Sequence, residues 1–416
     1  MDILGSLFTA SFSRVYFALS QLGIVSIISY FGHPNDVGLY GLCLAIMVPL
    51  CGFLGMGIRV GIATDQSDSY NLAECLENRF ITCVIITIIF CGICLAIYPK
   101  NVIFFGICLL IPKLSDLFNE MFYGFYQKFN CLENINKSLN LRSLSSPLLM
   151  LITIWITQSV KLAILVWGFS WFYIAYRYDF QKIQIIVDKG NQFSARTDPF
   201  VKKIIRYFKT FWSHKELAVS TLIGGLANFI PIFFIERYGG NGSLNTFTLI
   251  FVVFNAVNTI TARILMTGVR NFSGVDNTNF PNRFDSNQFR VIAAFLVLII
   301  LMNIIIHFYG INLFQILFGG LNSFSNDILK LFAYGFSVKI LNNIAMVLLQ
   351  SKRLFKLCLI VDIVTLIIIT SVLLFFYTGN PLLSVFAQGF LIAQVVVFIF
   401  NFILITKINN WFPRQS

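Results

Sequence analysis

The chain has 416 residues, of which 57% are hydrophobic and 12% charged, and its mean hydropathy is +0.80. Soluble domains are nearly half apolar and about a quarter charged, so this composition excludes an ordinary soluble globule. The net charge of +12 does not indicate nucleic-acid binding, because the cations are spread over connections between apolar segments. Membrane topology and anionic headgroups explain cations in such places.

Twelve apolar windows follow one another along the chain. A helix needs roughly 20 residues to cross a bilayer. The windows lack the alternation of polar and apolar residues that barrel strands show, so we predict an all-α integral membrane protein. We place its spans at 11–31, 37–57, 80–98, 102–124, 144–158, 162–176, 217–235, 245–267, 291–309, 327–349, 357–377 and 382–405.

Lysines and arginines fall on alternate connections. With both termini in the cytoplasm, the inner connections and the tail hold 22 of the 30 cations, and the outer connections hold Lys100, Lys161 and Arg237. The positive-inside tendency therefore favours cytoplasmic termini. The same tendency indicates that 144–158 and 162–176 are two spans joined by a tight hairpin. If they were one span, every later connection would change sides and the cationic loops would lie outside.

The longest connection, Asp179 to His214, divides the chain. We expect a six-helix N-terminal bundle at 1–178, a basic cytoplasmic linker at 179–214 and a six-helix C-terminal bundle at 215–416. In the linker, apolar and basic side chains repeat at helical spacing, which predicts an amphipathic helix on the inner leaflet. This helix either recruits anionic lipid or a cytoplasmic partner, or acts as a tether that fixes how the two halves meet the membrane. The apolar positions are Phe200, Val201, Ile204, Ile205, Phe208, Phe211 and Trp212.

The nine cysteines and three histidines show no spacing typical of a metal site or of a nucleophile with its base. Cys91 and Cys94 form the only paired spacing, inside an apolar helix, so we expect buried thiols. We therefore predict no metal ion, no catalytic residue and no cofactor other than a coupling proton or sodium ion. The N-terminus carries no basic leader, so we expect the first span to be retained.

Four different short motifs lie at or near the ends of predicted spans. Val37-Gly38-Leu39-Tyr40 opens the second span, and a glycine-rich run from Gly52 to Gly61 ends it, where we expect close helix packing. Tyr123-Gly124-Phe125-Tyr126-Gln127 ends the fourth span, and Ile316-Leu317-Phe318-Gly319-Gly320 precedes the tenth. In this order and spacing the chain resembles, over its whole length, the Wzx-type polysaccharide flippases (O-antigen transporters) of the multidrug/oligosaccharidyl-lipid/polysaccharide (MOP) exporter superfamily.

The resemblance implies a MATE-like fold of two six-helix bundles around a central cavity, lined largely by the first, second, seventh and eighth spans. It also implies a bacterial inner-membrane protein that is not an enzyme. Its cargo would be undecaprenyl-diphosphate-linked O-antigen or oligosaccharide repeat units, moved from the cytoplasmic to the periplasmic leaflet by alternating access. Membrane lipid, an O-antigen polymerase and a chain-length regulator are the implied partners.

Five cations lie inside the predicted spans, where an ionised side chain costs about 2.5–3.5 kcal/mol on insertion scales. Lys113 and Lys339 lie near the middle of their spans, Arg14 and Arg263 lie within about a turn of the cytoplasmic ends, and Lys330 follows an acidic residue at i+3 spacing. We predict that Arg14, Lys113, Arg263 and Lys339 line a cavity for the lipid diphosphate. Snorkelling to headgroups is the alternative for the arginines, and a helical ion pair for Lys330.

Acidic side chains accompany these cations. Lys113, Asp116 and Glu120 share one face of the fourth span, just past Pro112. Asp116, Glu120 and Asp362 are our candidates for binding and releasing a proton or sodium ion. An internal ion-pair ladder that neutralises itself and locks helices together is the alternative.

Two other classes of function compete with a flippase. A multidrug extruder that exchanges organic cations for sodium ions or protons needs a cavity dominated by carboxylates and aromatic rings, whereas cations outnumber clear anions within these spans. A membrane polysaccharide polymerase or ligase needs a large external loop with catalytic residues, whereas the longest outer connection, 310–326, is apolar and uncharged.

Overall fold

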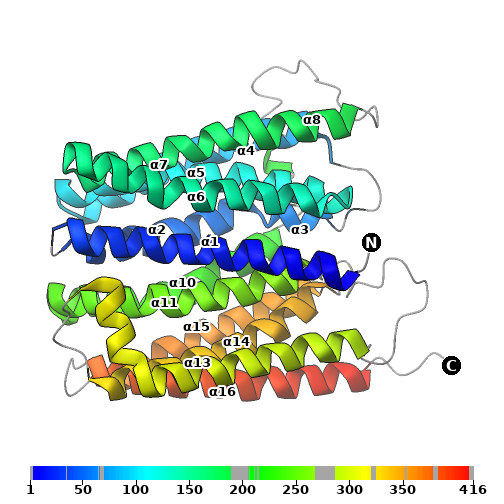
Figure 1. Ribbon diagram of the computed structural model, residues 1–416. Coiled ribbons are helices and arrows are strands. Elements are labelled where there is room, and N and C mark those ends of the chain that lie inside the picture. The colour runs from blue at the N-terminus through cyan, green and yellow to red at the C-terminus, as the bar shows by residue number, and fades with distance from the viewer. Residues whose placement is uncertain are drawn as a thin grey trace. The chain divides into compact units, whose positions relative to one another are not determined.

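The computed structural model describes residues 3–33, 35–63, 65, 70–188, 205, 207–209, 211–212, 215–267, 286–319, 325–351, 354–377 and 383–411. Within these ranges the chain is helical almost throughout and contains no strand (Figure 1). Contacts group the chain into two compact units, Met1–Leu226 and Ala227–Ser416. The boundary falls inside one helix, α10, and the division that we predicted at 179–214 stays a prediction.

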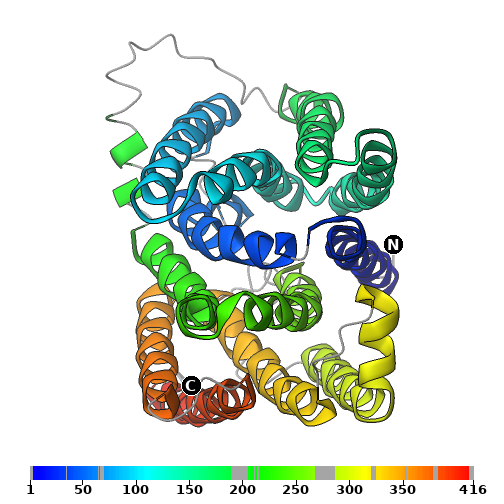
Figure 2. The same cartoon turned by 90° about the vertical axis from the view of Figure 1, so that its left-hand side faces the viewer.

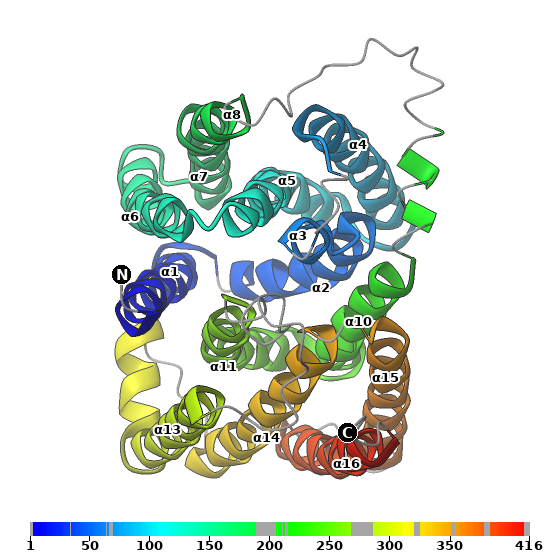
Figure 3. The same cartoon turned by 90° about the vertical axis from the view of Figure 1, so that its right-hand side faces the viewer.

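The N-terminal unit is built on α5, which packs against α2, α3, α4 and α7, while α1 packs along α6 (Figure 3). A π-helical turn, η1, joins α7 to α8 without a break. Its helices are α1 (Ile3–Phe31), α2 (Asp36–Gly55), α3 (Ile58–Ala63), α4 (Leu72–Ile97), α5 (Lys100–Lys128), α6 (Leu132–Thr157), α7 (Val160–Ile174), η1 (Ala175–Phe180), α8 (Gln181–Asp188) and the first half of α10 (Lys215–Tyr238).

The C-terminal unit is organised around α14, which packs against the other four helices that lie wholly in it (Figure 2). Aromatic rings fill much of the interior: Phe254 stacks on Phe336 at 5.1 Å between ring centroids, and Phe336 lies 5.0 Å from Phe390. The helices are α11 (Gly240–Thr267), α13 (Ser286–Phe318), α14 (Asn326–Ser351), α15 (Phe355–Tyr377) and α16 (Leu383–Trp411).

Each of the twelve predicted spans falls on a helix, so the prediction of a helical membrane bundle is confirmed. In the described part of the chain, nine segments are long and apolar enough to cross a membrane. The hairpin between the fifth and sixth spans is also confirmed, because Gln158 adopts φ 50° after α6 and the Ser159 side chain caps α7. The fifth span is longer than predicted, since α6 begins at Leu132 rather than near residue 144.

The glycine-rich run after the second span brings helices close together, as predicted. Met56 and Gly57 both adopt left-handed backbone, with φ of 56° and 55°, and this ends α2 before α3 begins in a new direction. On the facing helix, a Cβ added to Gly124 would lie 3.1 Å from the Arg59 carbonyl oxygen. The backbones of α3 and α5 are therefore in close contact, and this contact fixes where Arg59 lies.

Part of the predicted amphipathic linker helix lies within the described residues; Phe200, Val201 and Ile204 lie outside them. Phe211 packs edge-on against Phe53 at 5.2 Å, and Tyr207 is buried. A second set of apolar side chains, Ile205, Phe208 and Trp212, is exposed. The described side chains thus include a packed set and an exposed set, and the amphipathic helix on the inner leaflet stays a prediction.

Candidate functional site

The Tyr123–Gln127 motif at the end of α5 joins three other elements. The Tyr123 hydroxyl bonds to the Ser138 hydroxyl of α6 at 3.0 Å, and the Tyr126 hydroxyl donates to the Asp179 carbonyl oxygen of η1 at 3.0 Å. Gln127 accepts a hydrogen bond of 3.2 Å from Nε of Arg59, in α3. One short stretch of α5 therefore holds α3, α6 and η1 at one end of the N-terminal unit.

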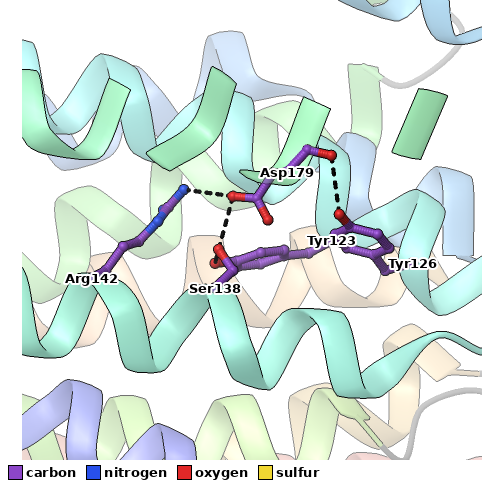
Figure 4. Close-up of polar contacts among 5 residues, drawn as sticks. All are labelled: Tyr123, Tyr126, Ser138, Arg142 and Asp179. Carbon is purple, nitrogen blue, oxygen red and sulfur yellow. Dashed lines mark hydrogen bonds and ion pairs between the residues drawn. The ribbon is translucent and has the colours of Figure 1, made fainter. Parts of the chain in front are cut away.

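A buried ion pair lies beside this motif (Figure 4). The Arg142 guanidinium donates to Oδ2 of Asp179 at 3.2 Å, and the Ser138 hydroxyl donates to the same oxygen at 2.8 Å. The side chains of Arg142 and Asp179 are 1% and 0% exposed. Within the described part of the chain, Oδ1 of Asp179 and Nε of Arg142 have no hydrogen-bond partner, although both atoms are buried.

Aromatic rings enclose the Arg142 guanidinium. Its central carbon lies 5.4 Å from the centroid of the Trp171 ring and 5.8 Å from that of Tyr123, both within the range of cation–π attraction. Trp171 donates from Nε1 to the Ser146 hydroxyl at 2.8 Å, and Ser146 in turn donates to the Arg142 carbonyl oxygen. The rings exclude water, so the charge on Arg142 is balanced mainly by Asp179.

A second ion pair, between α3 and α5, also contacts the Tyr123 ring. Arg59 donates to the Glu120 carboxylate at 2.8 Å, and its guanidinium carbon lies 5.5 Å from the Tyr123 ring centroid. These side chains are 12% and 25% exposed, so this pair is less enclosed than the first. Lys128 pairs with Asp65 at 3.0 Å and fastens the segment after α3 to the end of α5.

The π-helical turn places Asp179 at the site. A π-helical turn inserts one extra residue, so the side chains after it are rotated by roughly 100° relative to an uninterrupted α-helix. Asp179 lies beyond the apolar segment 162–176 and faces α5 and α6. Burial raises the pKa of its carboxyl from 3.8 to about 6, against the opposing effect of Arg142 and of the hydrogen bonds from Ser138 and Arg142.

The predicted site residues of the N-terminal unit occupy different surroundings. Arg14 is buried in α1. Lys113 and Asp116 are half-buried on α5, and both lie near Cys51 of α2. No ion pair joins Lys113 to Asp116 in the described structure, and Glu120 pairs with Arg59 of α3. The three side chains on the α5 face thus do not form a ladder among themselves.

In the C-terminal unit, Lys339 is buried on α14 with its ammonium 5.0 Å from the ring centroid of Phe336 and 5.8 Å from that of Phe251. Its Nζ has no hydrogen-bond partner among the residues that the structure describes. Asp362 is half-buried on α15, close to Cys358 one turn earlier. The Arg263 side chain lies outside the described residues.

Near the start of α14, the predicted helical ion pair is confirmed: Lys330 lies 3.8 Å from Asp327. Farther along, Asn342 donates to Oε1 of Gln394 at 3.1 Å and accepts from Asn401 at 3.2 Å, which links α14 to α16 by carboxamides. Among the described residues, no three His, Cys, Asp or Glu side chains gather in a way that could hold a metal ion.

Hydropathy does not predict the most enclosed part of this site. By the predicted spans, Arg59 and Arg142 fall in cytoplasmic connections and Asp179 is the first linker residue. A signal for Arg142 exists in the sequence, because Ser138, Arg142 and Ser146 recur every four residues and so form a polar stripe on one helical face. Hydropathy alone does not detect this stripe, because the polar residues lower the mean hydropathy and so move the predicted start of the span toward the C-terminus.

Comparison with solved structures shows what kind of bundle this is. A MOP superfamily transporter from Pyrococcus furiosus, whose binding pocket is described as having reverse polarity, superimposes with a TM-score of 0.67 over 96% of this chain and 95% of that chain at 16% identity. An outward-facing multidrug resistance MATE family transporter of the same superfamily gives 0.69 over 99% and 97% at 15% identity. The chain has the fold of the MOP superfamily transporters.

A third solved structure shows a similar likeness, whereas the sequence comparison covers less of the chain. The MATE transporter of Vibrio cholerae in its D35N form gives a TM-score of 0.61 over 98% of this chain and 97% of that chain, at 10% identity. No family model matches the sequence. The capsular polysaccharide biosynthesis protein CapF of Staphylococcus aureus is 26% identical over 245 residues, which is 58% of this chain and 58% of that protein. The match therefore spans less than two thirds of CapF.

Proposed function

We propose that this protein moves lipid-diphosphate-linked oligosaccharide repeat units across a bacterial inner membrane, from the cytoplasmic to the periplasmic leaflet. The observation that carries the proposal is the likeness to a capsular polysaccharide biosynthesis protein in a chain with the MOP transporter fold. Undecaprenyl diphosphate is the expected lipid carrier, and O-antigen or capsular repeat units are the expected sugars. Both termini are expected in the cytoplasm.

Cations inside the helices support an anionic cargo. Arg14 and Lys339 are buried and Lys113 is half-buried, although each lies within a predicted membrane span. A diphosphate accepts charge-assisted hydrogen bonds, which are among the stronger polar contacts and gain strength where water is scarce. We assign these three residues, together with Arg263, to the recognition of the diphosphate.

Carboxylates are the proposed coupling groups. Asp116 and Asp362 are half-buried, which suits a group that exchanges a proton or sodium ion with water. Glu120 is the weakest of the three candidates, because an ion that binds there competes with the Arg59 guanidinium at 2.8 Å. In this proposal the cargo crosses without covalent chemistry, as the protein alternates between states open to the two sides.

A second candidate function is the export of organic cations. It is favoured by the likeness in fold to a multidrug resistance MATE family transporter. The buried Arg14 and Lys339 argue against it, because the charged forms of these side chains repel a cationic cargo.

Loss of the gene in its native host separates these functions. A flippase defect makes lipid-linked repeat units accumulate on the cytoplasmic leaflet, and a plasmid copy restores the normal amount. An extruder defect instead raises the retention of cationic dyes, and a polymerase defect alters polymer chain length. Normal lipid-linked intermediates combined with lost dye efflux would contradict the proposal and favour the second candidate.

A further inference from the structure

The Asp179 carboxyl group is enclosed but only partly used. Its Oδ2 atom accepts hydrogen bonds from both Ser138 and Arg142, whereas its buried Oδ1 atom has no partner among the described residues. A buried polar atom without a partner is costly, and adding a proton lowers that cost because the group becomes neutral. We propose that Asp179 is a proton-binding site, with the proton on Oδ1, and that its titration is coupled to the transport proposed above.

Hydrogen-bond directions show that Oδ2 of Asp179 acts as an acceptor. Ser138 has one hydroxyl proton and donates it to Asp179, so the Tyr123 hydroxyl must donate its own proton to Ser138. The resulting chain runs from Tyr123 through Ser138 to the carboxylate. All its donors point toward Oδ2 of Asp179, so a proton that binds this carboxyl goes to Oδ1.

Protonation changes the charge of the site and breaks no covalent bond. The carboxylate takes up one proton from water and becomes a carboxylic acid, so the pair with Arg142 changes from neutral to singly positive. Arg142 then remains enclosed by Trp171 and Tyr123 without its counter-charge. The hydrogen bond between Arg142 and the carboxyl group then joins a cation to a neutral acceptor, so the contact between α6 and η1 changes.

The change extends to the second ion pair through Tyr123. That ring contacts both guanidinium groups, at 5.8 Å for Arg142 and 5.5 Å for Arg59, and Arg59 holds Glu120. When Arg142 moves, the ring loses one of its two cationic contacts. Proton binding at Asp179 is thereby linked to the junction of α3 with α5.

Charged and titratable groups surround Asp179 from each packed element. Helix α5 contributes Tyr123 and Tyr126, α8 contributes Lys182, and α7 contributes Trp171, which does not titrate. Helix α6 contributes Arg142, as well as Glu133, which acts on the neighbouring Tyr178. Arg142 and Lys182 favour the carboxylate, but burial outweighs them and raises the pKa of Asp179 to about 6.

Infrared titration of the purified full chain in lipid vesicles tests the site without any cargo. We expect the carbonyl band of a protonated carboxylic acid to appear as the pH falls through about 6, and to be lost in Asp179→Asn. Ser138→Ala removes a hydrogen bond to the carboxylate, so the midpoint should move to higher pH. Asp65→Asn is the matched control, since Asp65 pairs with Lys128 and not with Arg142, and it should keep the band.

Two outcomes of the titration would overturn the inference: an unchanged band in Asp179→Asn, or an unchanged midpoint in Ser138→Ala. Asp179→Glu guards against misfolding, because it keeps a titrating carboxyl and should restore a band that Asp179→Asn has lost. Transport under a pH gradient is a separate measurement. Wild-type vesicles that fail to move lipid-linked oligosaccharide contradict the proposed function, whereas an equal response to the gradient in Asp179→Asn contradicts only the coupling.

Discussion

The Arg59 guanidinium and the Glu120 carboxylate meet at 2.8 Å and join α3 to α5. The contact depends on the left-handed turn at Met56 and Gly57, which redirects the chain after α2. Glu120 is therefore held by a cation from another helix, and this partner distinguishes it from Asp116 on the same face.

Replacing Glu120 by glutamine removes the charge but retains the shape. The pair is partly exposed, so after allowance for screening by solvent we expect a loss of about 1 kcal/mol of unfolding free energy. Thermal unfolding in detergent measures the effect. Glu133→Gln is the control, because Glu133 forms an exposed pair with Lys137 within one helix and its loss should leave the midpoint unchanged. Equal shifts for both variants would contradict a stabilising role for the α3–α5 pair.

Removing one partner of the buried pair should cost more than removing both charges. Arg142→Gln leaves the Asp179 carboxylate enclosed without its counter-charge, and such a change costs about 3–5 kcal/mol. Combining it with Asp179→Asn replaces the pair by neutral amides and should recover a large part of that loss. A double-mutant cycle by chemical denaturation measures the coupling. Additive effects of the two substitutions would refute the pairing.

Stability should depend on pH through Asp179. Its pKa is raised from 3.8 to about 6 by burial, so between these values the folded protein holds a proton that the unfolded chain has released. The contribution is therefore fully present below pH 3.8 and is lost as the pH rises through about 6. We expect Asp179→Asn to flatten this part of the stability curve. The raised pKa would be contradicted if the stability of the wild-type protein did not decline between pH 4 and pH 6, or if Asp179→Asn showed the same decline.

The spans were predictable because their apolar runs are long and the cations mark alternate connections. The start of α6 was not, because Glu133, Lys137 and Arg142 reduce the apolar average over its first three turns. Hydropathy treats those charges as loop residues, whereas the helix continues through them and buries Arg142 against an acidic partner.

The candidate site was predictable only in part. Sequence periodicity placed Lys113, Asp116 and Glu120 on one face of α5, but it could not identify Arg59 as the partner of Glu120. That partner is set by the direction of α3 after a two-residue left-handed turn. Likewise, the orientation of Asp179 depends on a π-helical turn, which the local composition does not predict.

The in-helix lysines should be needed for export of the polymer. Lys113→Ala and Lys339→Met should each abolish delivery of polysaccharide to the cell surface at an unchanged amount of membrane protein. Lys113→Arg should be tolerated better, because Lys113 is half-buried, while Lys339 is enclosed by Phe251 and Phe336 and leaves less room for a guanidinium. Lys330→Ala is the control, since Lys330 pairs with an exposed aspartate. Normal surface polymer in Lys113→Ala and Lys339→Met would refute the cationic role.

Movement of a labelled lipid-diphosphate oligosaccharide between the leaflets of protein-containing vesicles tests the proposed function most directly. A membrane-impermeant quencher added outside reports how fast inner-leaflet label reaches the outer leaflet. We predict that vesicles with the wild-type protein are quenched faster than empty vesicles. Vesicles with Lys113→Ala should be quenched at the same rate as empty ones. Wild-type vesicles that quench no faster than empty ones, yet export a cationic dye, would contradict the account.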